Sequence, residues 1–441
     1  MYNHLMSFIK LPSIPRPSEG PDSSDLFLAL DIGTEFVKCV LATSEKKSKK
    51  SLSGKLKVLG FSKVAQSPGN MSSGIIKNIS GVVETCEEAL TDLEKKTDLR
   101  PKSVIVGISG EQVKGHTSTI RYRRDSPNKP ITDSELRDLL IKIESRAEKK
   151  AKDELSLESD NSEANPVLIN SAVVSISIDG YKVNNPVGFK GSEVLIEYYT
   201  AFAPSISVSA LEKIAAELRL ELIAVVAEPF AVCRACLGDD IDVDFSAVLI
   251  DVGAGTTDVA VVDSGDICGT KMFNIAGQSF TRQISESFNV KPATAEKYKL
   301  NLDDDSVLSD STINKLTAAL SRSLPVWITG VSMALEEFTN IEPLPTDILL
   351  CGGSANLLPL EEALATSDWY QGLSFERRPI IRLIDPLSLP DFVFPDDLDD
   401  KLDLDVSSVT ALGLLRVAVD TLLASPEKSS LKEKFSRLLS H

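Results

Sequence analysis

Three short segments of this chain combine the residue types that bind phosphate groups and divalent cations. The segment 248–262 is an apolar, β-branched run that ends at Asp251, followed by a Gly-Ala-Gly-Thr-Thr turn and a second apolar run. This pattern predicts a β-hairpin. Glycines let its turn approach a ligand closely, and successive backbone N–H groups and threonine hydroxyls suit phosphate oxygens. An aspartate beside that anion needs a cation between them, most simply Mg²⁺, although an ordinary glycine-rich hairpin also fits this segment alone.

The segment 26–41 repeats this design, because an apolar run reaches Asp31, turns through Gly33 and Thr34, and returns as a second apolar run. Two such hairpins facing each other would hold a polyphosphate from both sides. The segment 348–357 is a strand that enters a Gly-Gly-Ser turn and then a helix. Such a turn suits a backbone that lies flat against a base or a ribose.

In this order, the three segments resemble those of the actin/Hsp70/sugar-kinase ATPase superfamily. The first phosphate segment would be 31–38, the second 251–258 and the adenosine segment 351–356. The resemblance implies an α/β, actin-like ATPase fold of two lobes, with ATP and Mg²⁺ bound between them. A fold does not fix a function, so other parts of the chain must narrow the choice.

The resemblance also implies roles at the nucleotide. Asp31 and Asp251 would hold Mg²⁺ and its waters, and Glu228 would orient the attacking water, so Glu228 and Asp251 are the expected catalytic residues. Glu35 stands where relatives carry a small hydroxyl residue, and we therefore expect slow ATP hydrolysis at most. The expected nucleotide-binding residues are Gly33, Thr34, Glu35, Lys38, Gly253, Ala254, Gly255, Thr256, Thr257, Glu296, Lys299, Gly352, Gly353, Ser354 and Asn356.

Two of these assignments keep a simpler alternative. Glu228 is expected at the start of a helix, where an acidic side chain is favourable without any ligand. Glu296 and Lys299 match the Glu-x-x-Lys pattern whose helical face meets the ribose hydroxyls in relatives. Taken alone, such a pair is an ordinary surface salt bridge.

The composition bounds the class of protein. A chain of 441 residues with 42% hydrophobic and 25% charged residues suits a soluble protein of two or more domains. Its formal charge of −17 argues against a general nucleic-acid binder. No apolar run reaches the ~18 residues of a membrane span. The six scattered cysteines fit the reduced thiols of a cytoplasmic protein.

The expected order of elements divides the chain into two lobes with one insertion. Strands and helices alternate in α/β fashion in both lobes, while the insertion has one helix and several strands. The predicted segments are a disordered arm at 1–24, subdomain 1A at 25–109, inserted subdomain 1C at 110–201, 1A continued at 202–245, subdomain 2A at 246–276, subdomain 2B at 277–345, 2A continued with an acidic loop at 346–405, the closing helix of 1A at 406–424, a linker at 425–430 and an amphipathic helix at 431–441.

The insertion favours one family of the superfamily. In the cell-division protein FtsA, a subdomain of about this size follows the opening strands of the first lobe. That family shows stretches similar to Asp-Gly-Tyr at 179–181, Asn-Pro-Val-Gly-Phe-Lys-Gly at 185–191 and Gly-Ile-Ile-Lys-Asn at 74–78. The resemblance covers about 26–423 and favours FtsA over actin, Hsp70 or a kinase.

The last residues supply a separate physical signal. Leucine and phenylalanine recur at i, i+4, i+7 and i+8, on one face of a helix, among basic residues. Such a helix can lie in an anionic membrane surface with its apolar side chains below the headgroups. Packing on the protein's own domain is the alternative, and the family resemblance favours the membrane. The expected membrane-contacting residues are Leu431, Phe435, Leu438 and Leu439.

The resemblance therefore implies an ATP-binding, polymerising adaptor that tethers the tubulin-like ring protein FtsZ to the cytoplasmic membrane. The insertion at 110–201 would bind later division proteins, and an acidic FtsZ tail would meet basic residues of 2B. Those basic residues are Arg282, Lys291, Lys297 and Lys315. One alternative is a PilM-like pilus-assembly adaptor that binds a short peptide of a membrane partner. Another is a small-molecule kinase of the same superfamily.

Overall fold

The computed structural model describes residues 26–44, 55–159, 166–183, 185–238, 245–302, 307–339, 341–395 and 402–424. The predicted arm at 1–24, linker at 425–430 and amphipathic helix at 431–441 lie outside these residues. None of the described helices is both long and apolar enough to cross a membrane.

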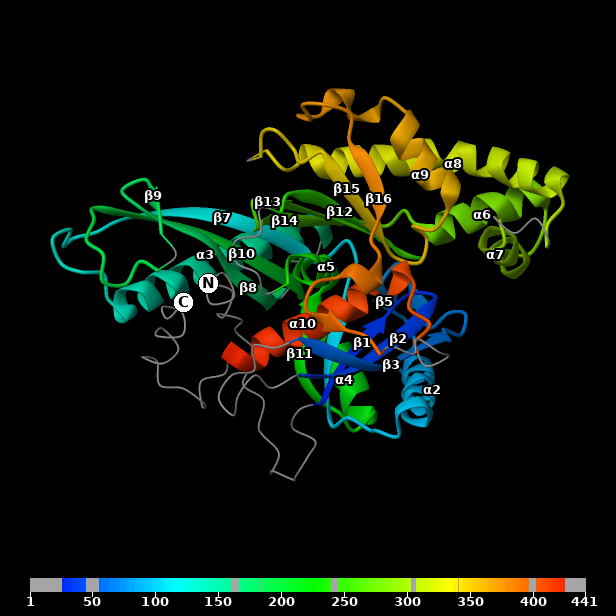
Figure 1. The fold of residues 1–441 in the computed structure, drawn as a ribbon, viewed down its shortest axis with the longest axis horizontal. Helices are drawn as coiled ribbons and strands as arrows, with labels where there is room; N and C mark the ends of the chain where they lie inside the picture. Colours follow the sequence, from blue (N-terminus) through cyan, green and yellow to red (C-terminus); the bar gives the residue numbers. More distant parts are fainter. Residues whose placement is uncertain are drawn as a thin grey trace.

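The first lobe is built on a six-stranded sheet in the order β11-β6-β1-β2-β3-β17. Helices α2 and α4 contact each other beside this sheet, and α10 packs on β1 and on α5 (Figure 1). Its strands and helices are β1 (Leu26–Ile32), β2 (Phe36–Ser44), β3 (Leu56–Ala65), β6 (Ser103–Ile108), β11 (Glu221–Ala227), β17 (Phe392–Val393), α2 (Ile79–Thr97), α4 (Ser205–Glu217), α5 (Glu228–Leu237) and α10 (Val409–Ala424), with the small pair β4 (Met71–Ser72) and β5 (Ile75–Ile76) and the 3-10 helix η3 (Val406–Ser408).

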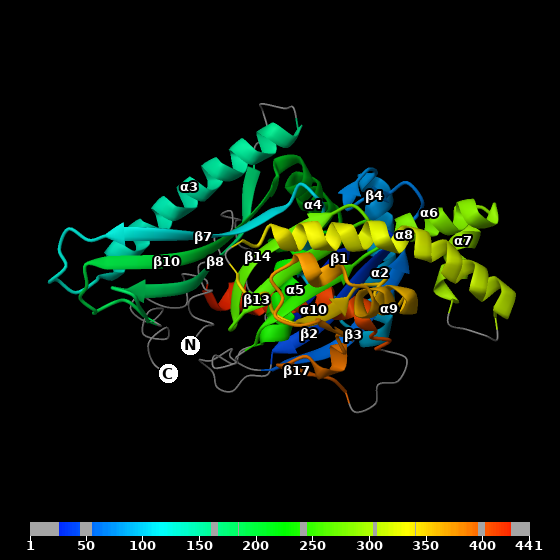
Figure 2. The ribbon, with the colours of Figure 1, turned by 90° about the horizontal axis from the view of Figure 1, so that it is seen from above.

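The second lobe repeats this arrangement. Its strands follow the order β16-β15-β12-β13-β14. In each lobe, three consecutive antiparallel strands form one half of the sheet, and two further strands add to it in parallel beyond the first strand of the hairpin. Figure 2 shows α8 lying across this sheet. The elements are β12 (Ala247–Val252), β13 (Thr257–Asp263), β14 (Asp266–Phe273), β15 (Asp347–Cys351), β16 (Ile380–Leu383), α6 (Gly277–Phe288), α7 (Pro292–Leu300), α8 (Asp310–Glu336), α9 (Leu358–Thr366), η1 (Trp369–Gly372) and η2 (Pro386–Ser388).

Both predicted hairpins are confirmed. β1 pairs antiparallel with β2, and β12 pairs antiparallel with β13. The sequences of these strands are continuous apolar runs because each sheet is covered on both faces. β12, for example, is buried along its whole length. Because the two lobes share one strand order, the two hairpin turns occupy equivalent positions and meet at the interface between the lobes.

The insertion consists of β7 (Lys114–Arg123), α3 (Asp133–Ser159), β8 (Pro166–Ile178), β9 (Tyr181–Lys182) and β10 (Glu193–Pro204). Its strands continue the sheet of the second lobe, because β7 pairs with β14 at Thr270 and its neighbour. A Cβ at Gly115 would come within 1.9 Å of Thr270 Oγ1, so a glycine is required at this junction. The insertion is thus covalently continuous with the first lobe, and its strands are hydrogen-bonded into the sheet of the second lobe.

The closing helix α10 is fixed by a buried ionic cluster. Asp420 Oδ2 accepts a hydrogen bond from Arg234 Nε of α5 at 2.8 Å, and Asp420 Oδ1 accepts one from Arg416 at 2.7 Å. Burial raises the pKa of Asp420, but the two guanidinium groups outweigh burial and hold it below its ordinary value. The cluster therefore ties α10 to α5, the helix that enters the interface between the lobes.

Candidate functional site

A cavity of about 270 Å³ lies between the two lobes, at the turns of the two hairpins. Of the residues expected at the nucleotide, most line it. The lining residues are Asp31, Ile32, Gly33, Thr34, Glu35, Phe36, Lys38, Lys63, Gly74, Ser109, Glu228, Asp251, Gly253, Ala254, Gly255, Thr256, Asp258, Glu296, Lys299, Leu300, Gly353, Ser354 and Ser407.

The first turn connects β1 to β2. Its Gly33 N–H donates to the carbonyl oxygen of Phe36 at 3.0 Å, which closes the turn tightly. The ammonium of Lys38 donates to Asp31 Oδ2 at 2.7 Å, and both side chains are largely buried. Burial lowers the pKa of Lys38, but the surrounding carboxylates, Asp31 first, outweigh burial and raise it. Lys38 therefore stays charged and can attract phosphate.

The second turn, between β12 and β13, has the same geometry. Gly253 N–H donates to the carbonyl oxygen of Thr256 at 3.0 Å. Asp251 accepts a hydrogen bond from the Thr410 hydroxyl of α10. Asp258, two residues beyond Thr256, is 2% exposed, and its Oδ1 has no hydrogen-bond partner among the residues that the structure describes. A buried carboxyl oxygen without a partner is costly, and a ligand in the cavity would satisfy it.

Asp31, Asp251 and Asp258, here called the hairpin aspartates, make the cavity strongly acidic. Burial first, and then the other hairpin aspartates, raise the pKa of Asp258 well above its ordinary value. Burial, and then the hairpin aspartates, do the same to the pKa of Glu228. Burial also raises the pKa of Asp251, against a hydrogen bond from Thr410 that lowers it. All of these carboxyl groups can be ionised at the same time only if a cation offsets their negative charge.

The donor set fits Mg²⁺, which prefers oxygen ligands. Within the described part of the chain, no three His, Cys, Asp or Glu side chains stand close enough to hold a metal ion by themselves. A magnesium ion here would thus take some of its ligands from water and from phosphate, as this ion commonly does.

The third predicted segment, the turn after β15, forms another part of the cavity wall through Gly353 and Ser354. Ser354 Oγ donates to the carbonyl oxygen of Gly253 at 2.8 Å, so the turn after β15 is held against the second hairpin. On α7, Glu296 accepts from Lys299 Nζ at 2.8 Å. Lys299 is only 5% exposed and also donates to Thr281 Oγ1 at 2.9 Å. The pair therefore belongs to the cavity wall, with Lys299 buried and Glu296 half-buried, whereas the simpler alternative was an ordinary surface salt bridge.

Three expected nucleotide-binding residues do not line the cavity. The Thr257 side chain is fully buried, and its hydroxyl donates to the carbonyl oxygen of Ile275 at 2.7 Å and accepts from Trp327 Nε1 at 2.9 Å. Gly352 is also buried, and at φ +92° it makes room for Asp251. Asn356 is exposed beyond the turn.

Other cavity residues were missed by sequence reasoning. Asp258 could have been found, because side chains alternate along a strand and Asp258 shares the face of Thr256. Ser109 Oγ lies 3.3 Å from Thr256 Oγ1, and Ser109 directly follows β6. Lys63 donates to Ser407 Oγ at 3.0 Å from a strand far away in sequence. No local pattern indicates such neighbours.

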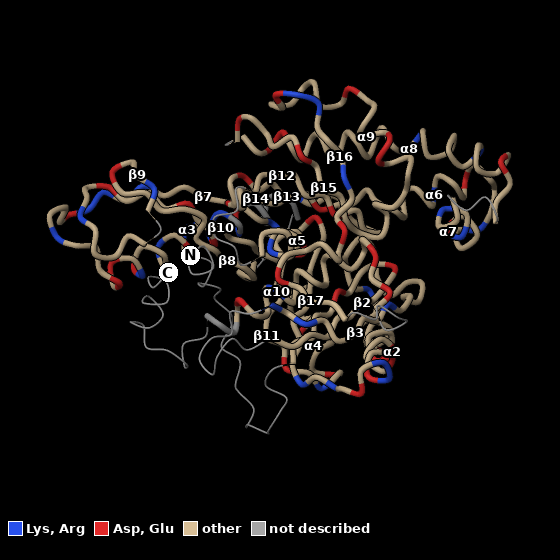
Figure 3. The backbone as a smooth tube through the Cα atoms, viewed as in Figure 1, with Lys and Arg blue, Asp and Glu red and all other residues tan. Residues whose placement is uncertain are grey.

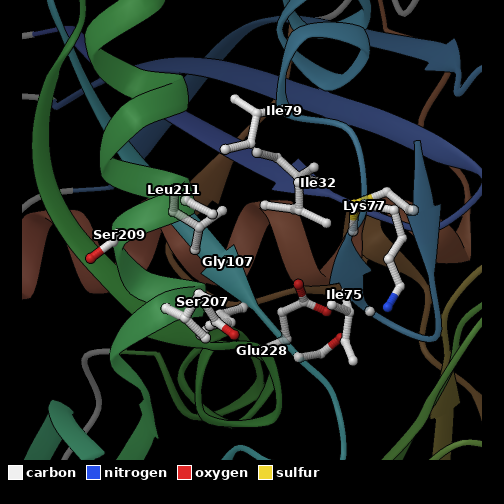
Figure 4. Close-up of a pocket in the computed structure, with 16 residues that line it drawn as sticks. Ile32, Ile75, Lys77, Ile79, Gly107, Ser207, Ser209, Leu211 and Glu228 are labelled. Carbon is white, nitrogen blue, oxygen red and sulfur yellow. The ribbon is translucent and has the colours of Figure 1, made fainter. Parts of the chain in front are cut away.

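Glu228 is the first residue of α5 and separates this cavity from a second one. The second cavity, of about 420 Å³, is mainly apolar and lies between α4 and the β4–β5 pair. Figure 4 shows Glu228 beside Ile75, with Leu211 of α4 on the far side. Glu228 lines both cavities. Its carboxyl group is thus placed beside any ligand at the hairpin turns.

Comparison with family models gives two matches. Residues 248–371 match the model described as cell division protein FtsA, and residues 181–306 match the MreB/Mbl protein model. The first match contains the second hairpin, α6 to α9 and the turn after β15.

Curated relatives point the same way. The chain is 26% identical over 276 residues to the cell division protein FtsA of Streptococcus pneumoniae, covering 62% of this chain and 55% of that protein. It is 26% identical over 365 residues to FtsA of Enterococcus hirae, covering 75% and 74%. FtsA of Bacillus subtilis is 21% identical over 282 residues, covering 64% and 59%. The match thus spans little more than half the length of the pneumococcal relative.

A solved structure, the PilM-PilN type IV pilus biogenesis complex, has a chain that aligns with a TM-score of 0.62 and 17% identity, covering 89% of this chain and 98% of that one. At this identity the likeness concerns the fold alone. The predicted fold class and the predicted resemblance to FtsA are both confirmed. The chain has the actin-like ATPase fold, and in sequence it is similar to the cell division protein FtsA.

Proposed function

We propose that this chain is an FtsA-like adaptor of bacterial cell division that binds ATP with Mg²⁺ between its two lobes. The observation that carries the proposal is the meeting of two aspartate-ended hairpins at one cavity, where a buried oxygen of Asp258 has no partner among the described residues. The similarity to FtsA over 248–371 supports this family among proteins with the same fold.

In this proposal, the charged Lys38 and the backbone of both hairpin turns bind the phosphate groups. Asp31, Asp251 and Asp258 face the cation. A bound Mg²⁺ supplies the positive charge that lets these carboxyl groups ionise together beside phosphate. Gly353 and Ser354 line the part of the cavity where the base would lie, and the pair of Glu296 and Lys299 would face the ribose.

Glu228 orients the attacking water in this proposal. Its carboxyl lies in the cavity wall, where burial and the hairpin aspartates raise its pKa well above the ordinary value and make it a better proton acceptor. Hydrolysis is slow at most, because Glu35 occupies the place of a small hydroxyl residue in the first turn. ATP then acts mainly by closing the lobes and favouring a homopolymer.

The adaptor role rests on surfaces outside the cavity. Residues Leu431, Phe435, Leu438 and Leu439, beyond the described part of the chain, would attach the protein to an anionic membrane surface on the inner face of the cell membrane. Exposed basic residues of the second lobe would bind the acidic tail of an FtsZ-like partner, and the insertion would bind later division proteins. Figure 3 shows basic positions on α6 and α7. The exposed basic residues are Arg282, Lys291, Lys297 and Lys315.

Co-sedimentation with liposomes tests the tether. The full chain should sediment with vesicles that contain anionic lipid, more strongly with Mg²⁺ and ATP, because several copies on one polymer bind through avidity. A chain ending at Ser425 should stay in the supernatant. A full chain carrying Leu438→Asp and Leu439→Asp is the matched control that keeps the length. Equal sedimentation of all three proteins would contradict the membrane role.

A PilM-like role is the second candidate, favoured by the likeness to the chain of the PilM-PilN complex over 89% of this chain. It requires a short peptide of a membrane partner and no lipid-binding helix. Binding of an acidic FtsZ tail peptide, weakened by Lys297→Glu, would favour the cell-division role. Sedimentation that needs a partner peptide in the vesicle would favour the pilus role.

A further inference from the structure

Two side chains bridge the cavity from opposite lobes. Gln278 Nε2, in the first turn of α6, donates to Glu35 Oε1 of the first hairpin turn at 2.6 Å. Glu35 lines the cavity. This pair is here called the cleft bridge. Because a carboxylate acceptor strengthens a hydrogen bond, the bridge is a stronger contact than the neighbouring pair of hydroxyls, Ser109 and Thr256.

Both ends of the bridge are held by their own lobe. The carbonyl oxygen of Glu35 accepts the N–H of Gln66 at 2.8 Å, and Gln66 Nε2 reaches the carbonyl oxygen of Gly33 at 3.4 Å. On the other side, the N–H of Gln278 donates to the carbonyl oxygen of Ala254 at 2.7 Å. The bridge therefore joins two segments whose backbones are anchored within their own lobes.

We infer that the cleft bridge holds the cavity closed and sets the rate at which bound nucleotide leaves it. Release requires the two hairpin turns to separate, and separation breaks the hydrogen bond between Glu35 and Gln278. The contact of Ser109 with Thr256, at 3.3 Å between two hydroxyls, is the weaker neighbour of this bridge. Glu35 and Gln278 are thus positioning residues of the proposed nucleotide site, and the inference rests on that proposed function.

A matched pair exists for comparison. Asn274 Nδ2 donates to Glu111 Oε2 at the same 2.6 Å, but this pair is exposed and does not line the cavity. Beside it, β7 and β14 are already joined by their backbones. Loss of that pair should therefore leave the motion of the two hairpin turns unchanged.

Stopped-flow release of a fluorescent ADP analogue, with Mg²⁺ present, tests the inference. We expect release about fivefold faster in Glu35→Ala and in Gln278→Ala, and no faster still in the double variant, because each change breaks the same bond. Glu35→Gln keeps an acceptor and should lie between wild type and Glu35→Ala. Glu111→Ala and Asn274→Ala should match wild type. Additive effects of the two substitutions, or equal rates in all variants, would overturn the inference.

Amide hydrogen exchange of the nucleotide-free protein tests the effect of the bridge on the two lobes without any bound ligand. Exchange at 253–257 and at the start of α6 should quicken in Glu35→Ala and stay unchanged in Glu111→Ala. Unchanged exchange in Glu35→Ala would overturn the inference. Absence of nucleotide binding in the wild-type protein would instead contradict the proposed function, while the exchange measurement still decides the bridge.

Discussion

Gly255 of the second hairpin turn lies so close to Thr34 of the first that a Cβ at position 255 would come within 2.5 Å of Thr34 Oγ1. The same Cβ would lie 2.9 Å from the Cα of Ser73. The two lobes therefore touch at the tips of their hairpins, and the contact has no room for a side chain. Glycine is required here by close approach, since its φ is not in the left-handed region.

Gly255→Ala should hold the lobes apart and weaken binding of ATP with Mg²⁺ about tenfold or more, because overpacking at a fixed contact costs about 1–3 kcal/mol. Isothermal titration calorimetry measures the affinity. Gly372→Ala is the control, since a Cβ at Gly372 would meet nothing within 4 Å. Equal affinity in both variants would show that the tips do not need to meet.

Asp258→Asn should stabilise the protein in the absence of ligand and weaken its magnesium-dependent nucleotide binding. The substitution removes a buried acid whose ionisation is opposed by burial and by the other hairpin aspartates, which we expect to be worth about 1 kcal/mol near neutral pH. The melting temperature should rise without nucleotide, and the rise on adding Mg²⁺ with ATP should shrink. The exposed Asp403→Asn serves as control. A lower ligand-free melting temperature would contradict the account.

Glu228→Gln should separate hydrolysis from binding. Loss of the carboxylate that orients water should slow phosphate release about 100-fold, while the affinity for ATP changes little. Release of phosphate by the purified protein and calorimetric titration measure the two quantities. If hydrolysis is unchanged, Glu228 is only the acidic first residue of α5, which is the alternative that the sequence left open.

Stability should fall at acid pH through Asp420. Its pKa is lower in the folded protein than the ordinary value of 3.8. The contribution of Asp420 to stability is thus complete above about pH 4 and is lost as the pH falls through the folded value. Asp420→Asn should cost about 3 kcal/mol near neutral pH, because Arg234 and Arg416 lose their carboxylate. Urea unfolding between pH 3 and pH 7 measures both effects. A surface change, Glu362→Gln, should leave the unfolding curves unaltered.

The sequence sufficed for the parts of the site that depend on local patterns. Apolar runs around Asp31 and Asp251 predicted both hairpins, and the glycines between them predicted tight turns. Thr257 does not line the cavity, because alternation along β13 turns its side chain toward Trp327. The same alternation could have pointed to Asp258.

Other neighbours of the site depend on tertiary packing and could not be predicted. Thr410 reaches Asp251 from the closing helix, 159 residues further along the chain. Gln278 meets Glu35 only because the first residues of α6 pack against the second hairpin turn. The pairing of β7 with β14 likewise joins segments whose sequences contain no signal for each other. Such contacts follow from the equivalent placement of two lobes and not from spacing.

Calorimetric titration of the full chain with ATP, with and without Mg²⁺, tests the central claim most directly. Two hairpins that hold one magnesium-bound nucleotide predict saturable binding of one ATP per chain, strong dependence on Mg²⁺, and loss of that dependence in both Asp31→Asn and Asp251→Asn. Absence of binding would contradict the account, and so would binding that neither magnesium nor the two aspartates affect.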